Sequence, residues 1–275
     1  MLPQGPIGVF DSGFGGLSVL RELQHALPDA DFLYLGDNAR APYGTRSFDT
    51  VYTYTLQAVR WLFDHDCPLV IIACNTASAK ALRSIQQLDL PRIAPHRRVL
   101  GVIRPTAEAV GQLSATGVVG LLGTPGTVAS GSYDIEVAKL HPGFRVVAEA
   151  APMWVPIVEQ GFAASDGADW FVAEAVDRLL ARDPDIDTII LGCTHYPLLY
   201  DKIRAAVPAG IDLVCQGRIV ASSLLHYLGR HKDIDSAISR GGHTRYYTTD
   251  DAAAFAARAG VFLGHDIEAR TTSLQ

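Results

Sequence analysis

Eight short apolar runs, separated by segments with helical patterns, constrain the fold of this chain more than any other feature. Runs of four to six residues rich in isoleucine and valine are typical of central parallel strands covered on both faces. Their alternation with helical segments predicts an α/β protein with mainly parallel sheets and helical crossovers. The predicted strands are residues 6–10, 31–35, 69–73, 99–103, 118–122, 144–148, 188–191 and 212–215.

Helices are predicted between these strands from the spacing of their apolar residues. Leu17, Leu20, Leu23 and Leu27 share one face of a helix after the first strand. Ser47 is a predicted N-cap for the helix after the second strand.

Two breaks, around residues 91–98 and 208–210, predict two lobes. The first lobe consists of residues 1–97 and 211–275, and the second consists of residues 98–210. We expect an approximate internal duplication, in which two similar α/β lobes face each other across a cleft that holds the active site.

Cys74 and Cys193 occupy matching places, 119 residues apart, at the end of an apolar run and before a polar turn that contains threonine. In open α/β sheets ligands bind at the carboxyl ends of the strands. Free cysteine is often a buried space-filling residue, and we interpret Cys67 and Cys215 in this way. The matched pair instead predicts a reaction with two sulfur acid/base groups. A disulfide is not expected, and without a CxxC motif neither is a zinc site.

Other polar turns follow the first, second and fifth predicted strands, at residues 11–16, 36–44 and 123–127. The glycines of the first turn permit close approach of backbone to a ligand, although Asp11 or Ser12 could simply be an N-cap. The chain has no GxGxxG dinucleotide motif. The hydroxyls and N–H groups of the third turn are suited to holding a carboxylate.

The net charge of −6, with four lysines against nineteen arginines, leaves no basic stripe of the kind that nucleic acids require. The N-terminus lacks a signal-peptide pattern, and no apolar stretch approaches the roughly 18 residues of a membrane span. We therefore expect neither nucleic acid nor a membrane as a partner, and a cytoplasmic location.

Six motifs, in order along nearly the whole chain, resemble those of glutamate racemases. They are Asp-Ser-Gly-Phe-Gly-Gly at 11–16, Ala-Pro-Tyr-Gly at 41–44, Ala-Cys-Asn-Thr-Ala at 73–77, Gly-Thr-x-x-Thr at 123–127, Val-Pro-Ile-Val-Glu-Gln-Gly at 155–161 and Gly-Cys-Thr-His-Tyr-Pro at 192–197. The resemblance implies a racemase that needs no cofactor and no metal, forms a homodimer and converts L-glutamate to D-glutamate for peptidoglycan.

The resemblance also implies roles for individual residues. Cys74 would serve one enantiomer and Cys193 the other, with Asp11 and His195 as auxiliary groups beside the thiols. Glu159 would be a further carboxylate near the second thiol, unless it is an ordinary solvated helix residue. The implied substrate-binding residues are Asp11, Ser12, Pro42, Tyr43, Gly44, Asn75, Thr76, Thr124, Thr127, Thr194 and His195.

Two residues depart from the family pattern. Arg104 and Trp154 stand where relatives prefer other residues, so they could alter the entrance of the cleft.

Three other functions remain open. A related two-cysteine racemase or isomerase, acting on aspartate for example, would share the thiol turns. A two-lobed amino-acid-binding protein would give no reason for paired thiols. A thiol hydrolase could pair Cys193 with His195 but would leave Cys74 unexplained.

Overall fold

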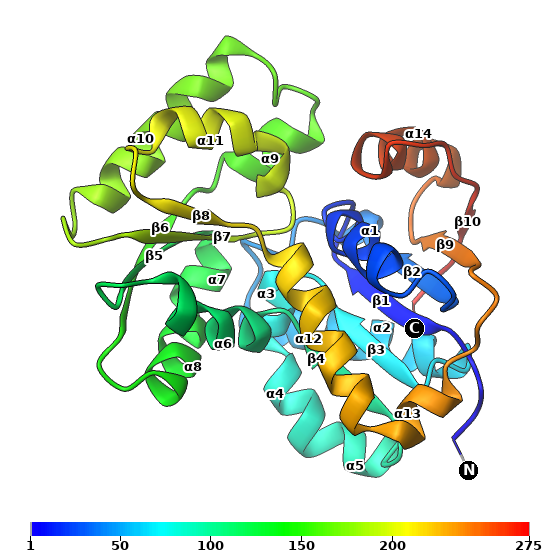
Figure 1. Ribbon diagram of the computed structural model, residues 1–275. Coiled ribbons are helices and arrows are strands. Elements are labelled where there is room, and N and C mark those ends of the chain that lie inside the picture. The colour runs from blue at the N-terminus through cyan, green and yellow to red at the C-terminus, as the bar shows by residue number, and fades with distance from the viewer. Residues whose placement is uncertain (1, 275) are drawn as a thin grey trace.

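Two parallel β-sheets flanked by helices form the framework of the protein in its computed structural model (Figure 1). The structure describes residues 2–274, except for the side chain of Val261. The larger sheet has six strands in the order β10-β9-β2-β1-β3-β4, and the smaller has four in the order β6-β5-β7-β8. The prediction of parallel α/β sheets is therefore confirmed. The strands are β1 (Ile7–Asp11), β2 (Phe32–Gly36), β3 (Leu69–Ile72), β4 (Arg98–Gly101), β5 (Val118–Gly123), β6 (Arg145–Ala150), β7 (Thr188–Gly192), β8 (Asp212–Val214), β9 (Thr244–Thr248) and β10 (Ala269–Thr271).

The eight predicted strands correspond to β1–β8, with ends that differ by a few residues. The largest differences are two residues: the predicted fourth strand runs on to 103 although Ile103 already begins a helix, and β6 ends at Ala150 instead of 148. Strand β10, at the edge of the larger sheet, and β9 beside it were not predicted. The central strands β1, β3, β5 and β7 are buried along their whole length, which explains their continuous apolar runs.

The helices cover both sheets, and their ends follow local capping chemistry. Ser47 caps α2 by accepting the Thr50 N–H at 3.2 Å, as predicted. Leu17, Leu20 and Leu23 are buried on one face of α1. The helices are α1 (Leu17–Ala26), α2 (Phe48–Asp64), α3 (Asn75–Lys80), α4 (Leu82–Ser84), α5 (Leu90–Ile93), α6 (Ile103–Leu113), α7 (Pro125–Ala129), α8 (Ser132–Leu140), α9 (Trp154–Glu159), α10 (Asp166–Leu180), α11 (Tyr200–Ala206), α12 (Gln216–Arg230), α13 (Lys232–Ala237) and α14 (Ala252–Leu263), with short η turns at Asn38–Arg40, Ile85–Asp89 and Tyr196–Leu199.

The chain passes between the sheets twice, through α6 on the way out and through α12 on the way back (Figure 1). Strand β4 pairs with β3 of the larger sheet, and β8 pairs with β7 of the smaller one. We therefore propose that the lobes divide just after β4 and just after β8, a few residues beyond the divisions expected after residues 97 and 210.

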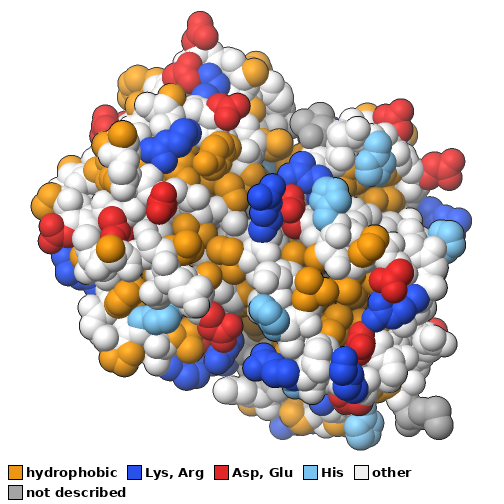
Figure 2. Space-filling view, viewed as in Figure 1, with side chains coloured by type: hydrophobic (Ala, Val, Ile, Leu, Met, Phe, Trp, Pro, Cys, Tyr) orange, Lys and Arg blue, Asp and Glu red, His pale blue; other side chains and the backbone are white. Residues whose placement is uncertain are grey.

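The two sheets carry one cysteine turn each. Cys74 follows β3 in the larger sheet, and Cys193 follows β7 in the smaller sheet. On the face of the molecule seen in Figure 2, acidic and basic side chains are interspersed rather than gathered by sign. No helix in the described part of the chain is long and apolar enough to cross a membrane.

Candidate active site

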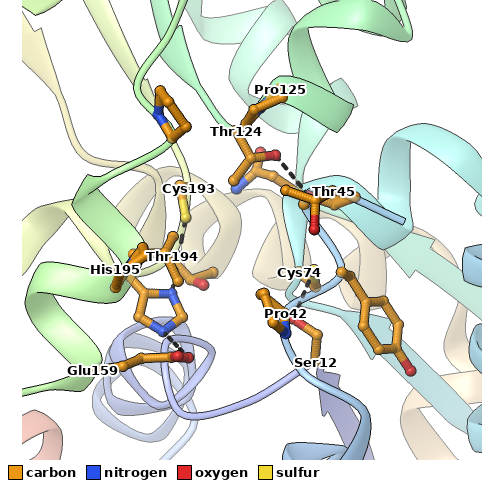
Figure 3. Close-up of a pocket in the computed structure, with 17 residues that line it drawn as sticks. Ser12, Pro42, Thr45, Cys74, Thr124, Pro125, Glu159, Cys193, Thr194 and His195 are labelled. Atoms are coloured by element: carbon orange, nitrogen blue, oxygen red, sulfur yellow. Dashed lines mark hydrogen bonds and ion pairs between the residues drawn. The ribbon is translucent and has the colours of Figure 1, made fainter. Parts of the chain in front are cut away.

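Cys74 and Cys193 face one cavity, which they reach from opposite sides (Figure 3). The cavity is small, with a volume of about 90 Å³, below the roughly 300–1,000 Å³ that is usual for drug-sized ligands. Both cysteines are buried, with 6% and 7% of their surface exposed. The cavity is lined by Ser12, Pro42, Tyr43, Gly44, Thr45, Cys74, Asn75, Thr76, Thr124, Pro125, Pro152, Val155, Pro156, Glu159, Cys193, Thr194 and His195.

The Cys74 thiol lies at the start of α3 and has two hydrogen-bond partners. Its sulfur accepts the N–H of Ala77 at 3.5 Å and lies 3.4 Å from the hydroxyl of Ser12. Burial raises the pKa of Cys74 to about 12, and the Asp11 carboxylate adds to this, while the two hydrogen bonds act in the opposite direction. Cys74 is therefore a protonated thiol at neutral pH.

Cys193 belongs to a chain of three groups that ends in a carboxylate. Its sulfur lies 3.8 Å from Nδ1 of His195, and Nε2 of the same ring lies 3.1 Å from Oε1 of Glu159 (Figure 3). Burial alone would lower the pKa of His195, but its bonds to Cys193 and Glu159 outweigh burial and raise the pKa to about 10. The ring is therefore an imidazolium at neutral pH, held between two groups that can carry negative charge.

Asp11 lies beneath the cavity rather than in its wall. One oxygen accepts the Gly13 N–H at 2.9 Å, and the other accepts the Thr194 hydroxyl at 3.4 Å. Burial raises the pKa of this carboxyl, although the charge of His195 and two backbone N–H groups partly compensate. Among the residues implied by the resemblance, Asp11 and Thr127 are the two that do not line the cavity.

Hydroxyl and backbone contacts join the two lobes along another wall of the cavity. The Thr76 hydroxyl lies 2.9 Å from the Thr124 hydroxyl and 3.3 Å from that of Thr127, which does not itself line the cavity. The Gly126 N–H donates to the Gly44 carbonyl at 2.8 Å. Glycine is required at 44 because a Cβ there would lie 2.9 Å from the Cβ of Thr124.

Five lining residues were missed by the sequence analysis: Thr45, Pro125, Pro152, Val155 and Pro156. Three of them come from the segment just before Glu159, and the other two directly follow predicted residues. Val155, Pro156 and Pro125 lie within motifs already named, whereas Thr45 and Pro152 had no signal other than proximity to predicted residues.

Arg104 and Trp154, which depart from the family pattern, do not line the cavity. The Arg104 side chain is half exposed on α6 and forms an ion pair with Glu108 at 2.9 Å. Trp154 is buried, donates its indole N–H to the Phe171 carbonyl at 3.0 Å and packs edge-on against Tyr196. Neither side chain therefore shapes the wall of the cavity directly.

The lining contains no lysine or arginine in the part of the chain that the structure describes. Carboxylates in this cavity would meet hydroxyls, the Asn75 amide and backbone N–H groups, together with the imidazolium of His195. Between residues 2 and 274, no cluster of three or more histidine, cysteine, aspartate or glutamate side chains could hold a metal ion.

Comparison with known proteins agrees with this geometry. The model of the Asp/Glu/hydantoin racemase family matches residues 7–223. The glutamate racemase of Ruegeria sp. is 42% identical over 276 residues, which cover 95% of this chain and 97% of the relative. The glutamate racemase of Streptococcus mutans is 37% identical, with 98% of each chain covered.

Solved structures agree as well. The glutamate racemase of Bacillus anthracis superimposes with a TM-score of 0.89 at 32% identity over 98% of both chains. The enzyme of Francisella tularensis, determined in complex with D-glutamate, gives a TM-score of 0.87 at 30% identity over 98% of both chains. The chain therefore belongs to the Asp/Glu/hydantoin racemase family and, within it, to the glutamate racemases.

Proposed function

We propose that this protein interconverts L-glutamate and D-glutamate by moving protons between the substrate and two cysteines. The observation that carries the mechanism is the placement of Cys74 and Cys193, from separate sheets, on opposite sides of one cavity. A base on one face of the α-carbon and an acid on the other invert the stereocentre in a single passage of the substrate. The same arrangement works in both directions if the two thiols exchange their protonation states.

The two thiols have different surroundings. The imidazolium of His195 lies beside Cys193 and suits that sulfur to act as the base, whereas Cys74 holds its proton. We assign the α-proton of L-glutamate to Cys193: the C–H bond breaks, a new S–H bond forms, and the electron pair remains on the α-carbon. The Cys74 S–H then breaks as its proton is delivered to the opposite face, which gives D-glutamate. Cys74 takes the α-proton when the reaction runs in reverse.

Electrostatics must lower the barrier in this mechanism, because the carbanion at the α-carbon has little stabilisation of its own. Hydroxyls of Ser12, Thr76 and Thr124 and the Asn75 amide surround the cavity and can donate to the two carboxylates of glutamate. Glu159, which also lines the cavity, supports the charge of His195. Asp11 acts from below, through the Thr194 hydroxyl and through its charge on Cys74.

The product is proposed to supply peptidoglycan synthesis in the cytoplasm, from an enzyme that works as a homodimer. The role in peptidoglycan synthesis, the cytoplasmic location and the homodimer are proposed from the family rather than from the geometry of the cavity.

Incubation of each glutamate enantiomer in heavy water tests the proposal. Each enantiomer should yield its mirror image carrying deuterium at the α-carbon, because the incoming proton comes from a thiol that has exchanged with solvent. Chiral chromatography should show no comparable conversion of aspartate. Conversion of aspartate at the rate of glutamate, or a product that retains its original α-hydrogen, would contradict the proposed substrate or mechanism respectively.

A further inference from the structure

A ring of three buried side chains lies next to Cys74 and includes one residue of the cavity wall. Asn75 donates from Nδ2 to Oε1 of Gln216 at 2.7 Å. Gln216 donates from Nε2 to the Tyr133 hydroxyl at 2.6 Å, and this hydroxyl donates to Oδ1 of Asn75 at 2.7 Å. All three residues are at least 95% buried, and only Asn75 lines the cavity.

The direction of the ring is set by the backbone. The Thr106 hydroxyl donates to the Val102 carbonyl at 2.8 Å, so its lone pair is free to accept the second N–H of Gln216 at 2.8 Å. That contact fixes which end of the Gln216 amide is the donor. The Tyr133 hydroxyl, which accepts from Gln216, must then donate onward, and so it meets the oxygen of Asn75 rather than its nitrogen. A flipped Asn75 amide would place two oxygens against each other and is excluded.

The orientation of Asn75 leaves one of its Nδ2 hydrogens unused within the described part of the chain. The Asn75 amide is held at both its oxygen and its nitrogen, so it cannot rotate to donate its second N–H to another protein group. This hydrogen therefore stays available to a carboxylate in the cavity. The ring also brings together the two helices through which the chain crosses between the sheets, since Thr106 lies on α6 and Gln216 begins α12. Burial raises the pKa of the Tyr133 phenol, on α8, and a charge on the Cys193 sulfur would add to this.

We propose that Tyr133 and Gln216 are positioning residues for the racemase reaction, which hold the Asn75 amide so that its remaining N–H donates to a carboxylate of glutamate. The inference rests on the proposed role of Asn75 in substrate binding. Neither Tyr133 nor Gln216 touches the substrate: both act through Asn75. Because Gln216 on α12 also donates to Thr106 on α6, the ring is attached to both crossing helices, and it ties the geometry of the binding amide to the relative placement of the two lobes.

The test compares Tyr133→Phe, Asn75→Ala and the double variant, with KM and kcat measured for both glutamate enantiomers. Asn75→Ala should raise KM by roughly tenfold to hundredfold, the worth of one hydrogen bond to a charged group. Tyr133→Phe should raise KM by about tenfold, at the lower end of that range, because the amide is still present but free to turn. kcat should change by less than about threefold. In the double variant KM should equal that of Asn75→Ala within about twofold, because the two changes act through one contact.

Tyr52→Phe is the matched control. It removes the phenol hydroxyl of Tyr52 on α2, which donates to Asp89 at 2.7 Å. Neither Tyr52 nor Asp89 lines the cavity. Its melting temperature should fall as in Tyr133→Phe, while its KM stays that of the parent protein.

A folded Tyr133→Phe protein with the parent KM overturns the inference, as do multiplicative effects of Tyr133→Phe and Asn75→Ala on KM. If Tyr133→Phe does not fold, Gln216→Met, which keeps the volume and removes both polar ends, decides by the same criterion. An unchanged KM in Asn75→Ala would also overturn the inference, while racemisation by the two cysteines would stand.

Discussion

Replacing Glu159 by glutamine should weaken the proton affinity of His195 without disturbing the packing of the site. The glutamine oxygen can still accept the bond from Nε2 that Glu159 accepts at 3.1 Å, so only the charge is lost. An opposite charge close to a titrating group shifts its pKa by roughly 1–3 units, and because the hydrogen bond is retained we place the loss at the lower end, about 1.4 kcal/mol. Since 1.36 kcal/mol corresponds to one pKa unit, the pKa of His195 should fall by about one unit from its value of about 10.

The direction of the pKa shift of His195 determines which limb of the pH profile should move. The pKa of His195 is raised in the folded protein, so the imidazolium and its support of Cys193 are present at neutral pH and are lost as pH rises through that pKa. Glu159→Gln should therefore leave L-glutamate turnover at pH 7 nearly unchanged and move the alkaline limb of kcat/KM about one unit toward neutrality.

Two assays follow the same group. A titration of His195 by NMR with labelled histidine measures the pKa directly, and the pH dependence of kcat/KM measures its functional consequence. Glu174→Gln, in a surface pair with Arg178, is a matched control that should shift neither. A His195 that is already neutral at pH 7 in the parent protein, or an alkaline limb that does not move in Glu159→Gln, would refute the account of this site.

Two further outcomes are expected. Alkylation of the thiols should abolish racemisation, and saturating glutamate should protect both Cys74 and Cys193, because both line the cavity. Peptide mass spectrometry locates the modified residues, and full activity after modification of both would contradict the mechanism. Activity should also survive exhaustive dialysis against a chelator, because the proposed proton transfers involve only side chains of this chain. Loss of activity that zinc restores would count against it.

The sequence predicted the position of both cysteines because their signal is local. A short apolar run followed by a polar turn specifies the carboxyl end of a buried strand, and Cys74 and Cys193 lie directly after β3 and β7. Strands β9 and β10 escaped prediction because they lie toward one edge of the larger sheet, where burial is partial and the apolar run is interrupted.

The rest of the site depends on contacts between residues far apart in the chain. Tyr133 and Gln216 are 58 and 141 residues from Asn75, and nothing in their local sequence indicates that they meet it. The depth of a residue is equally hidden: Asp11 and Thr127 belong to motifs that were predicted to bind substrate, yet both lie behind the cavity wall. Local patterns indicate where a strand ends, whereas the packing of two lobes decides which side chains reach the ligand.

The central claim is that Cys74 and Cys193 each serve one face of the α-carbon. Elimination of chloride from 3-chloroglutamate tests it most directly, because this reaction needs removal of the α-proton but no delivery of a proton to the other face. Cys74→Ser and Cys193→Ser should each lose most racemisation, since a hydroxyl is a far weaker base than a thiol at neutral pH. Circular dichroism and the melting temperature should confirm that both variants fold.

With the two α-configurations of 3-chloroglutamate supplied separately, the variants should show opposite preferences. Cys74→Ser, which keeps Cys193 and its imidazolium partner, should eliminate chloride mainly from the L-configured compound. Cys193→Ser, which keeps Cys74 beside Ser12, should do so mainly from the D-configured compound. Elimination from the same enantiomer by both variants, or near-normal racemisation by either, would contradict the division of the two faces between the two thiols.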